Sequence, residues 1–369
     1  MSRSLLYRIA KAISRSWDYW RVRLRLGSRK PLTIHTYRGF GTPTFLFMQG
    51  RVLRDRSIFR AETDGAWRNL VNTIKRFNSR EINDAELTIH FADRVFCVRT
   101  DAEGFYRLAT TLEPPLPPLS ADAPFWQEAE VHLHRIPYEG KVDLRQRAEI
   151  LFPRSAGFGI ISDIDDTILK TYVTSWLKWR MIYLSILKNA VSRQAFRAVS
   201  PFYQALRRGA SQTAYNPFFY VSNSPWNLYD FLDDFLNQNK LPRGPILLRD
   251  FGLPYEDRPS DYRGHKHEQI IQILELYPDL PFVLIGDSGE KDADIYHSVV
   301  HEYPGRIKAV YIRDVRSPKR AKRVRQLLND LPVPSMLVQH YADAARHAAE
   351  HGLLDFDYFE HLADSSGIG

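Results

Sequence analysis

The stretch Asp163-Ile164-Asp165-Asp166-Thr167 decides which fold the chain is expected to adopt. It follows Gly159-Ile160-Ile161-Ser162, an apolar run that predicts a buried strand. In an open α/β sheet, ligands bind beyond the carboxyl ends of the strands. There, Asp163 can attack phosphorus, Asp165 can pass a proton to the leaving oxygen, and Thr167 can hold the loop in shape. The alternative interpretation is an aspartate-rich turn that only caps a helix.

A second apolar run ends in a hydroxyl group. The run 217–222 predicts a strand that finishes at Ser222, and Ser224-Pro225 is a typical start for a helix over 226–235. Backbone amides at a helix N-terminus bind anions. Ser222, Asn223 and the amides behind them are therefore candidates to bind a phosphate group.

A lysine and a second acidic pair complete the set. Lys266 stands at the head of an amphipathic stretch that predicts a helix. The run 281–286 predicts a third strand, and Asp287 follows it directly, with Asp292 five residues later. Three of the four motifs thus come immediately after a strand pattern, which favours one shared site over a chance distribution of polar residues.

This set resembles the four signature motifs of the haloacid dehalogenase superfamily of phosphohydrolases. More closely, the stretches 157–167, 220–229, 247–250 and 284–292 resemble the actin-patch-associated phosphatidate phosphatase family, a distant relation of the lipins. The resemblance covers about 150 to 320, roughly half of the chain. It implies a Rossmann-like parallel sheet and a phosphatase that hydrolyses a phosphate monoester.

The resemblance also implies a role for each acid. Asp163 would be the nucleophile that forms an aspartyl-phosphate. Asp165 would protonate the leaving alcohol and then activate the water that breaks the intermediate. A cation must offset the repulsion between carboxylate and phosphate, and Mg²⁺ is the expected cofactor because it is a hard ion with oxygen ligands. Asp163, Asp287 and the backbone carbonyl of Asp165 would hold it.

The remaining residues of the set are expected to bind phosphate or to support that binding. The phosphate ligands predicted in this way are Thr167, Ser222, Asn223 and Lys266. Asp292 would orient Lys266 or a metal-bound water. Lys291 lies in the last motif and is an alternative to Lys266, while Asp166 is expected to be structural.

Composition limits the class of protein. The 369 residues suffice for two domains, and 44% hydrophobic with 25% charged residues is ordinary for a globular chain. The single cysteine, Cys97, excludes an internal disulfide framework and fits a reducing compartment. Because Cys97 lies between Phe96 and Val98 in a strand-like run, we expect a buried thiol.

Positive charge is concentrated in two segments. Residues 1–30 carry nine Lys or Arg against one Asp, and residues 170–210 carry eight against none. Each segment is therefore +8, and because the whole chain is also +8, the remainder is −8. Two basic patches on an acidic body indicate a localised anionic partner rather than a nucleic-acid-coating surface.

The pattern divides the chain into three parts. Residues 1–30 predict a basic amphipathic helix that lies on a membrane, docks on the protein or serves as a targeting segment. Residues 31–152 predict a β-sandwich-like domain with one helix over 67–77. Residues 153–369 predict a phosphatase domain. The helical insertion of the phosphatase domain, 170–210, is either a lid that touches lipid or an ordinary packed helix pair.

Strands are predicted in both larger parts. In the first they cover 31–38, 44–53, 86–91, 95–100, 105–110, 128–136 and 146–152. In the second they cover 158–162, 218–221, 245–248, 282–285 and 306–312, and they alternate with helices as in a parallel sheet.

Three functions are compatible with these features. The first is hydrolysis of phosphatidate to diacylglycerol by a cytoplasmic protein bound peripherally to a membrane, since no apolar run is long enough to span one. The second is a soluble small-molecule or phosphoprotein phosphatase. The third is a membrane-binding scaffold without catalysis. No nucleic-acid partner is expected, and the oligomeric state is left open.

Overall fold

The computed structural model describes most of the chain. The described residues are 31–54, 80–117, 125–137, 139–154, 156–164, 190–212, 215–249, 264–289, 291–315 and 317–365. Several predictions fall outside them: the helices expected over 1–30 and 67–77, the residues Asp165, Asp166 and Thr167, and the part of the insertion that covers 170–189.

The chain divides into two compact units. The described residues of the first unit lie within 31–39, 46–111 and 127–150. The second unit contains the described residues within 40–45, 112–126 and from 151 onward. Two short segments of the strand-rich half of the sequence are thus grouped with the second unit.

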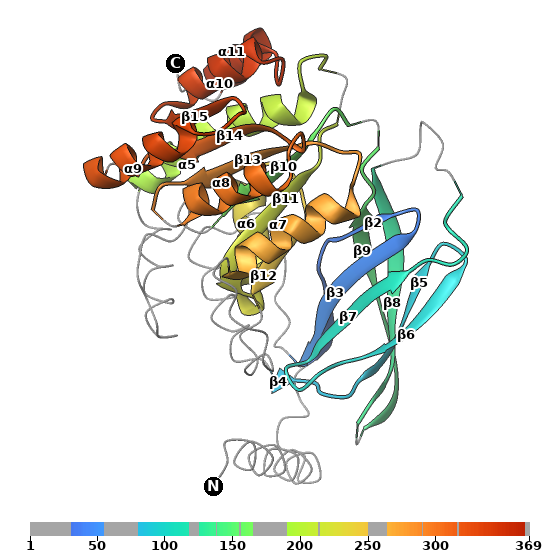
Figure 1. Ribbon diagram of the computed structural model, residues 1–369. Helices are drawn as coiled ribbons and strands as arrows, with labels where there is room; N and C mark the ends of the chain where they lie inside the picture. Colours follow the sequence, from blue (N-terminus) through green and yellow to red (C-terminus); the bar gives the residue numbers. More distant parts are fainter. Residues whose placement is uncertain are drawn as a thin grey trace, which may run out of the picture. The chain divides into compact units, whose positions relative to one another are not determined.

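The first unit is built on a strand-rich sheet (Figure 1). Its strands are β1 (Leu32–Thr36), β2 (Gly39–Thr42), β3 (Phe45–Arg54), β4 (Arg80–Glu81), β5 (Glu86–Phe91), β6 (Arg94–Arg99), β7 (Phe105–Thr111), β8 (Trp126–Ile136) and β9 (Gly140–Leu151). The order is β1-β3-β2-β9-β8-β5-β6, and β4 and β7 also pair with β3. The predicted strand-rich character is confirmed, but the strands are linked into one hydrogen-bonded sheet rather than two separate sheets.

Side-chain burial in this sheet follows the strand period. Leu87, Ile89 and Phe91 of β5 are buried and alternate with more exposed polar residues. Cys97, in contrast, is exposed, so the expectation of a buried thiol is wrong. Its strand β6 stands at the end of the sheet order and has no fully buried position. A strand-like run of apolar residues does not show whether its strand is central or at an edge.

The second unit is organised around a parallel sheet of six strands. Their order is β12 (Ile246–Arg249), β11 (Phe218–Pro225), β10 (Gly159–Asp163), β13 (Phe282–Asp287), β14 (Ile307–Arg313) and β15 (Ser335–Val338). Every neighbouring pair is parallel. All residues of β10 and β13 are buried, which explains why these central strands read as continuous apolar runs.

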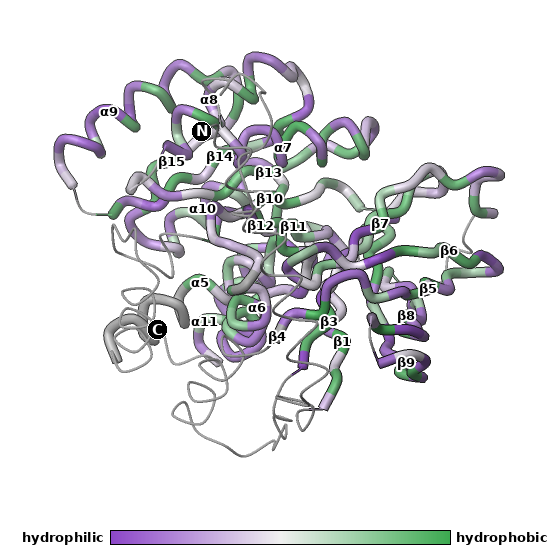
Figure 2. The backbone as a smooth tube through the Cα atoms, turned by 90° about the horizontal axis from the view of Figure 1, so that it is seen from below, coloured by the Kyte–Doolittle hydropathy of each residue, from purple (hydrophilic) through white to green (hydrophobic). Residues whose placement is uncertain are grey.

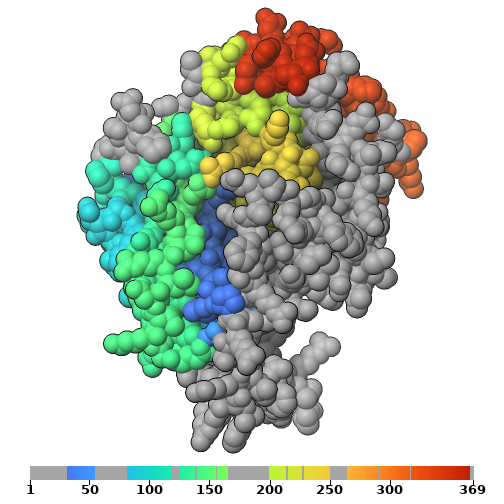
Figure 3. Space-filling model, turned by 180° about the vertical axis from the view of Figure 1, so that it is seen from behind, coloured from blue at the N-terminus to red at the C-terminus, as the bar shows by residue number. Residues whose placement is uncertain are grey.

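Helices cover both faces of this sheet, as seen edge-on in Figure 2. One face carries α7 (Gly264–Leu276), α8 (Asp292–Glu302) and α9 (Pro318–Asn329). The other face carries α5 (Ala190–Arg208), α10 (Tyr341–Glu350) and α11 (Phe356–Ser365), with α6 (Tyr229–Gln238) also on that side. Figure 3 shows α5 and the C-terminal helices side by side at the surface. The predicted parallel α/β architecture is confirmed, while placement in the haloacid dehalogenase superfamily stays a prediction.

Two local details differ from the expectation. The helix expected from residue 226 begins as a 3₁₀ turn, Trp226–Leu228, and α6 starts only at Tyr229. Ser224 lies inside β11, which continues through Pro225, and its backbone N–H donates a hydrogen bond to the Ser222 hydroxyl. Strand β15 was not predicted: its four residues are too few for a clear period, and three of them are half-buried.

Candidate active site

The carboxyl ends of the central strands bring three predicted residues to one edge of the sheet. Asp163 ends β10 and Asp287 ends the neighbouring strand β13. Ser222 lies in β11 directly after Val221, the residue that pairs with Asp163. All three side chains are buried, with Asp163 5% and Asp287 2% exposed. This edge, which we call the carboxyl edge, is where an open α/β sheet binds ligands.

Lys266 reaches the same edge from the first turn of α7. Its Nζ lies 2.9 Å from Asp163 Oδ1 and 2.7 Å from Asp292 Oδ1. Lys266 is only 2% exposed, and Asp292 is fully buried. Charged groups taken out of water are tolerated when they are paired in good geometry. The lysine therefore contacts two acids from different elements, one at the end of a strand and one at the start of α8.

Asp292 also contacts the strand that ends at Asp287. Its Oδ2 accepts a hydrogen bond from the Asp287 backbone N–H at 3.1 Å. Burial raises the pKa of Asp292, and the nearby Lys266 charge opposes that increase. Gly286 makes the approach possible, because a Cβ atom at this position would stand 2.5 Å from Asp292 Oδ2. Asp292 thus fixes the lysine and the end of β13 at once.

Ser222 is held in place by its own strand. The Ser222 hydroxyl is fully buried and accepts a hydrogen bond from the Ser224 N–H at 2.9 Å. A serine hydroxyl that accepts can also donate one hydrogen bond, for example to a phosphate oxygen. Asn223 follows in the same strand and is half-buried.

The other predicted residues lie apart or outside the described chain. Lys291 stands at the start of α8 and is exposed, whereas Lys266 is buried against Asp163. Of the two lysines, Lys266 is the one that contacts Asp163, and its role as a phosphate ligand stays a prediction. Asp165 and Thr167 follow the last described residue of this segment, Ile164, and are outside the described residues.

Arg313 is a residue at this edge that the sequence did not single out. It ends β14 and pairs in register with Asp287. Residues paired across parallel strands point to the same face of the sheet. Two residues earlier, Tyr311 packs against Phe202 of α5 and His347 of α10, which identifies that face. The predicted strand ended one residue before Arg313, so a basic residue directly after a strand was the signal that could have found it.

Two tyrosines, the buried Tyr203 and the half-buried Tyr341, stand beside Arg313. The Tyr203 hydroxyl of α5 lies 2.8 Å from the hydroxyl of Ser162, the residue before Asp163. Burial raises the pKa of Tyr203 and of Tyr341, and the Arg313 charge opposes the increase in both. In the described part of the chain, no carboxylate forms an ion pair with Arg313. The face that carries α5 and α10 thus presents a cation at the carboxyl edge, across the sheet from Lys266.

The carboxylates at this edge are suitable ligands for a hard cation. Two of the three predicted magnesium ligands, Asp163 and Asp287, are described, and both are buried at the ends of adjacent strands. Mg²⁺ binds through one or two carboxylates together with water and phosphate oxygens. The donor set therefore fits the expected metal.

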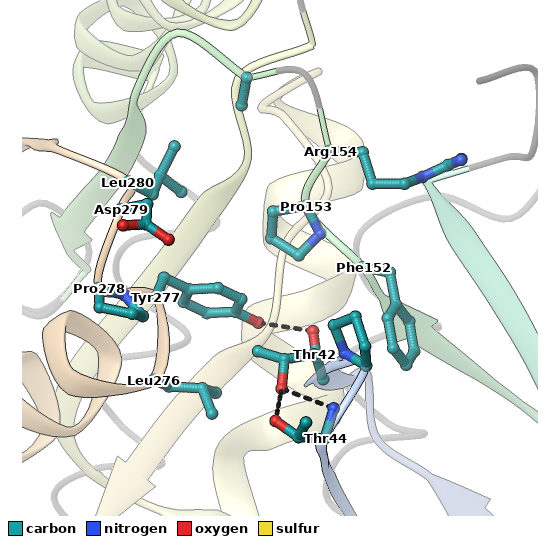
Figure 4. Close-up of a pocket in the computed structure, with 13 residues that line it drawn as sticks. Thr42, Thr44, Phe152, Pro153, Arg154, Leu276, Tyr277, Pro278, Asp279 and Leu280 are labelled. Carbon is teal, nitrogen blue, oxygen red and sulfur yellow. Dashed lines mark hydrogen bonds between the residues drawn. The ribbon is translucent and has the colours of Figure 1, made fainter. Parts of the chain in front are cut away.

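A cavity in the same unit lies elsewhere. It is lined by residues 41–44, by Phe152, Pro153, Arg154 and Ala156, and by residues 276–280 (Figure 4). The last two groups precede β10 and β13, so the cavity lies at the amino ends of these strands. Within it the Tyr277 hydroxyl donates to the Gly41 carbonyl at 3.2 Å. None of the predicted site residues lines this cavity, and we assign it no role in the chemistry.

Comparison with known proteins supports part of the predicted relationship. Residues 158–314 match the family model described as "Phosphatidate phosphatase APP1, catalytic domain". Phosphatidate phosphatase APP1 of Saccharomyces cerevisiae is 33% identical over 179 residues, and an uncharacterized protein of Schizosaccharomyces pombe is 31% identical over 180. Each alignment covers 48% of this chain and 29% of the relative. The chain thus spans less than a third of the length of these curated relatives.

Solved structures give no comparable support. A carbohydrate acetylesterase from Xanthomonas citri aligns over 73% of this chain and 66% of its own, with 12% identity and a TM-score of 0.26. A score this low does not indicate a shared fold. The family resemblance therefore rests on the sequence of residues 158–314.

Proposed function

We propose that this chain is a Mg²⁺-dependent phosphatase that hydrolyses a phosphate monoester through an aspartyl-phosphate on Asp163. The observation that carries the proposal is the buried contact of Lys266 with Asp163 and Asp292 at the carboxyl edge. The match of residues 158–314 to a phosphatidate phosphatase catalytic domain agrees with it. The proposal predicts phosphate release from a monoester in the presence of Mg²⁺.

The chemistry has two displacements at phosphorus. A carboxylate oxygen of Asp163 forms a bond to phosphorus while the ester P–O bond breaks, and Asp165 gives its proton to the departing alkoxide. Water then attacks the phosphorus of the aspartyl-phosphate and passes a proton to Asp165. The acyl-phosphate P–O bond breaks, inorganic phosphate leaves, and Asp163 is again a carboxylate.

The remaining residues of the edge stabilise charge. The Ser222 hydroxyl and the Lys266 ammonium would hold equatorial phosphate oxygens, where charge is concentrated in the transition state. Asp292 keeps Lys266 in position through the 2.7 Å contact. A Mg²⁺ ion held by Asp163 and Asp287 would neutralise the phosphate and reduce its repulsion of the nucleophile.

Phosphatidate is the proposed substrate. The family model and the yeast relative both carry the name phosphatidate phosphatase. One assay distinguishes phosphatidate from the alternative substrate, a soluble phosphate ester. Phosphate release is measured with phosphatidate in mixed micelles and with a panel of nucleotide, sugar and protein phosphates. Preference for phosphatidate supports the lipid assignment. Preference for soluble esters would overturn it, and the absence of turnover on all of them would favour the scaffold alternative.

Arg313 is proposed to bind a second side of the phosphate. Its charge stands at the end of β14 beside Asp287, on the face away from Lys266. A hydrogen bond to a charged group contributes about 1.5–3 kcal/mol, so Arg313→Gln should raise KM about 10- to 100-fold and change kcat less. Arg313→Lys should recover part of the loss. Steady-state kinetics on the preferred ester measure both constants.

A control for Arg313 lies on the same strand. Lys308→Gln removes one positive charge from the exposed, opposite end of β14. It lies five residues away, or about 17 Å. We expect its kinetic constants to match the wild type. Equal effects of the two substitutions would mean that Arg313 acts only through the overall charge of the protein.

Peripheral binding to an anionic membrane is proposed on the basis of α9. This helix buries Ala321, Val324 and Leu328 and carries five exposed basic residues with no acid. Its Arg320 donates to the Gly289 carbonyl, two residues beyond Asp287, so the basic helix begins near the carboxyl edge. Among the described residues, no helix is long and apolar enough to cross a membrane. A basic surface helix can instead attract an anionic leaflet.

The triple variant Lys319→Gln, Lys322→Gln, Arg325→Gln tests this contact. Each basic group near an anionic leaflet contributes about 1 kcal/mol, so binding to phosphatidylserine-containing vesicles should fall about 100-fold at low salt. Vesicle flotation measures the bound fraction. The control removes three exposed charges outside α9 with Lys141→Gln, Arg208→Gln and Lys308→Gln. Equal losses in the two variants would show that net charge, not α9, determines binding.

A further inference from the structure

Three metal-binding side chains gather where α8 meets the end of α9. His297 and His301 lie one helical turn apart on α8, and Asp330 follows α9 directly. His297 Nε2 is 2.7 Å from Asp330 Oδ2. One candidate ligand atom from each of the three residues lies within 4.8 Å of the other two. The group is in the half of α8 that is remote from Asp292, so it is separate from the proposed catalytic residues.

Hydrogen bonding prepares His301 to act as a ligand. Its Nδ1 lies 2.9 Å from the backbone carbonyl oxygen of His297. A carbonyl oxygen can only accept, so Nδ1 carries the proton of the neutral ring and Nε2 carries the lone pair. This is the arrangement in which proteins usually fix a metal-binding imidazole.

A hydrogen bond joins His297 Nε2 to Asp330 Oδ2, and its proton occupies the position that a bound metal ion would take. Because Asp330 is a hydrogen-bond acceptor when ionised, the 2.7 Å contact places a proton on His297 Nε2. A metal ion bound by both groups would replace this proton. The candidate ligand atoms lie within 4.8 Å of one another, and the exposure of His301 and Asp330 leaves both side chains room to move toward a shared ion.

We propose that His297, His301 and Asp330 form a zinc-binding site. Two imidazoles and one carboxylate suit Zn²⁺ better than Mg²⁺ or Ca²⁺, which prefer oxygen ligands alone. A water molecule would complete the tetrahedron. The site would tie α8 to the end of α9, two helices already joined by the Arg323–Asp294 ion pair. This proposal does not depend on the proposed phosphatase function.

The chain provides an internal control for this site. His347 on α10 and His351, which directly follows that helix, have the same spacing, and His351 Nδ1 lies 2.7 Å from the His347 carbonyl oxygen. The ring centroids are 4.4 Å apart in both histidine pairs. Among the described residues, however, no third ligand joins the α10 pair to make a group of three. A comparison of the two pairs therefore separates the proposed site from histidine binding in general.

The test is a titration of Zn²⁺ alone into the full chain, purified without a histidine tag and treated with a chelator. Competition with a chromophoric zinc indicator gives the dissociation constant and the stoichiometry. We expect one zinc ion per chain at the tightest site, and His301→Ala and Asp330→Asn should each weaken it at least about tenfold.

The double variant His347→Ala, His351→Ala is expected to keep the tight site. The proposal is overturned if that variant loses the site, or if His301→Ala and Asp330→Asn both bind zinc as the wild type does. Failure of the wild type to bind zinc in the micromolar range would also overturn it. Circular dichroism of each variant confirms that a lost site does not reflect a lost fold.

Discussion

Replacement of Asp163 with asparagine is expected to lower kcat by at least about 10³-fold. The amide has nearly the same shape as the carboxylate, but it cannot attack phosphorus as an anion or form the acyl-phosphate. The buried position of Asp163, 2.9 Å from Lys266, leaves little room for another group to take over this role. Phosphate release under single-turnover conditions, in the presence of Mg²⁺, measures the loss.

The control for this variant is Asp279→Asn. Asp279 lines the cavity at the amino ends of the strands, which is the end of the sheet opposite the carboxyl edge. The control should turn over at the wild-type rate, and both variants should keep the wild-type circular dichroism spectrum. Undiminished turnover by Asp163→Asn would show that the nucleophile is misassigned.

Replacement of Lys266 with methionine is expected to destabilise the protein by about 3–5 kcal/mol and to remove activity. The lysine is the buried counter-charge of Asp163 and Asp292, at 2.9 and 2.7 Å. Loss of one partner from a buried ionic group leaves uncompensated charge in the interior, and this is the costly change. Urea unfolding followed by tryptophan fluorescence measures the free energy of unfolding.

The same variant should show a characteristic pH dependence. Burial raises the pKa of Asp292 above its value in the unfolded chain. The stability that this group contributes is therefore fully present below the unfolded pKa and is lost as the pH rises through the folded pKa. Lys266 limits the increase in the wild type. Without the lysine the pKa of Asp292 rises further, and the deficit in stability should shrink as the pH is lowered.

A double variant checks the electrostatic explanation. Lys266→Met leaves two buried carboxylates without their lysine partner. Adding Asp292→Asn removes one of them, so part of the stability should return while activity does not. The exposed Lys308→Met should change the free energy of unfolding by no more than about 0.5 kcal/mol. If Lys266→Met unfolds at the wild-type urea concentration, Lys266 does not stabilise the two buried carboxylates.

Much of the second unit could be predicted from the sequence because its central strands are buried on both faces. The apolar runs before Asp163, Ser222 and Asp287 are unbroken, so both the strands and the polar residues at their ends are visible. Lys266 was found by its place at the head of an amphipathic helix. Its contact with Asp292 agrees with the expectation that Asp292 orients Lys266, whereas its contact with Asp163 depends on how α7 packs and has no signature in the sequence.

Other features depend on contacts between distant residues. Arg313 lies at the carboxyl edge only because β14 pairs with β13. The order of strands in a sheet cannot be predicted from the sequence of any single segment. The exposure of Cys97 follows from the position of β6 at the end of its sheet. Ser224 resembles a helix cap in the sequence, but the strand continues past it and the 3₁₀ turn displaces the start of α6.

The most direct test of the central claim is to trap the covalent intermediate. The protein is mixed with Mg²⁺ and its preferred ester, quenched in acid within one turnover, digested and mapped by mass spectrometry. We predict one added phosphoryl group on the carboxylate of Asp163, and none when Asp163→Asn is treated in the same way. A phosphoryl group on any other residue, or turnover with an unmodified Asp163 at every quench time, would contradict this account.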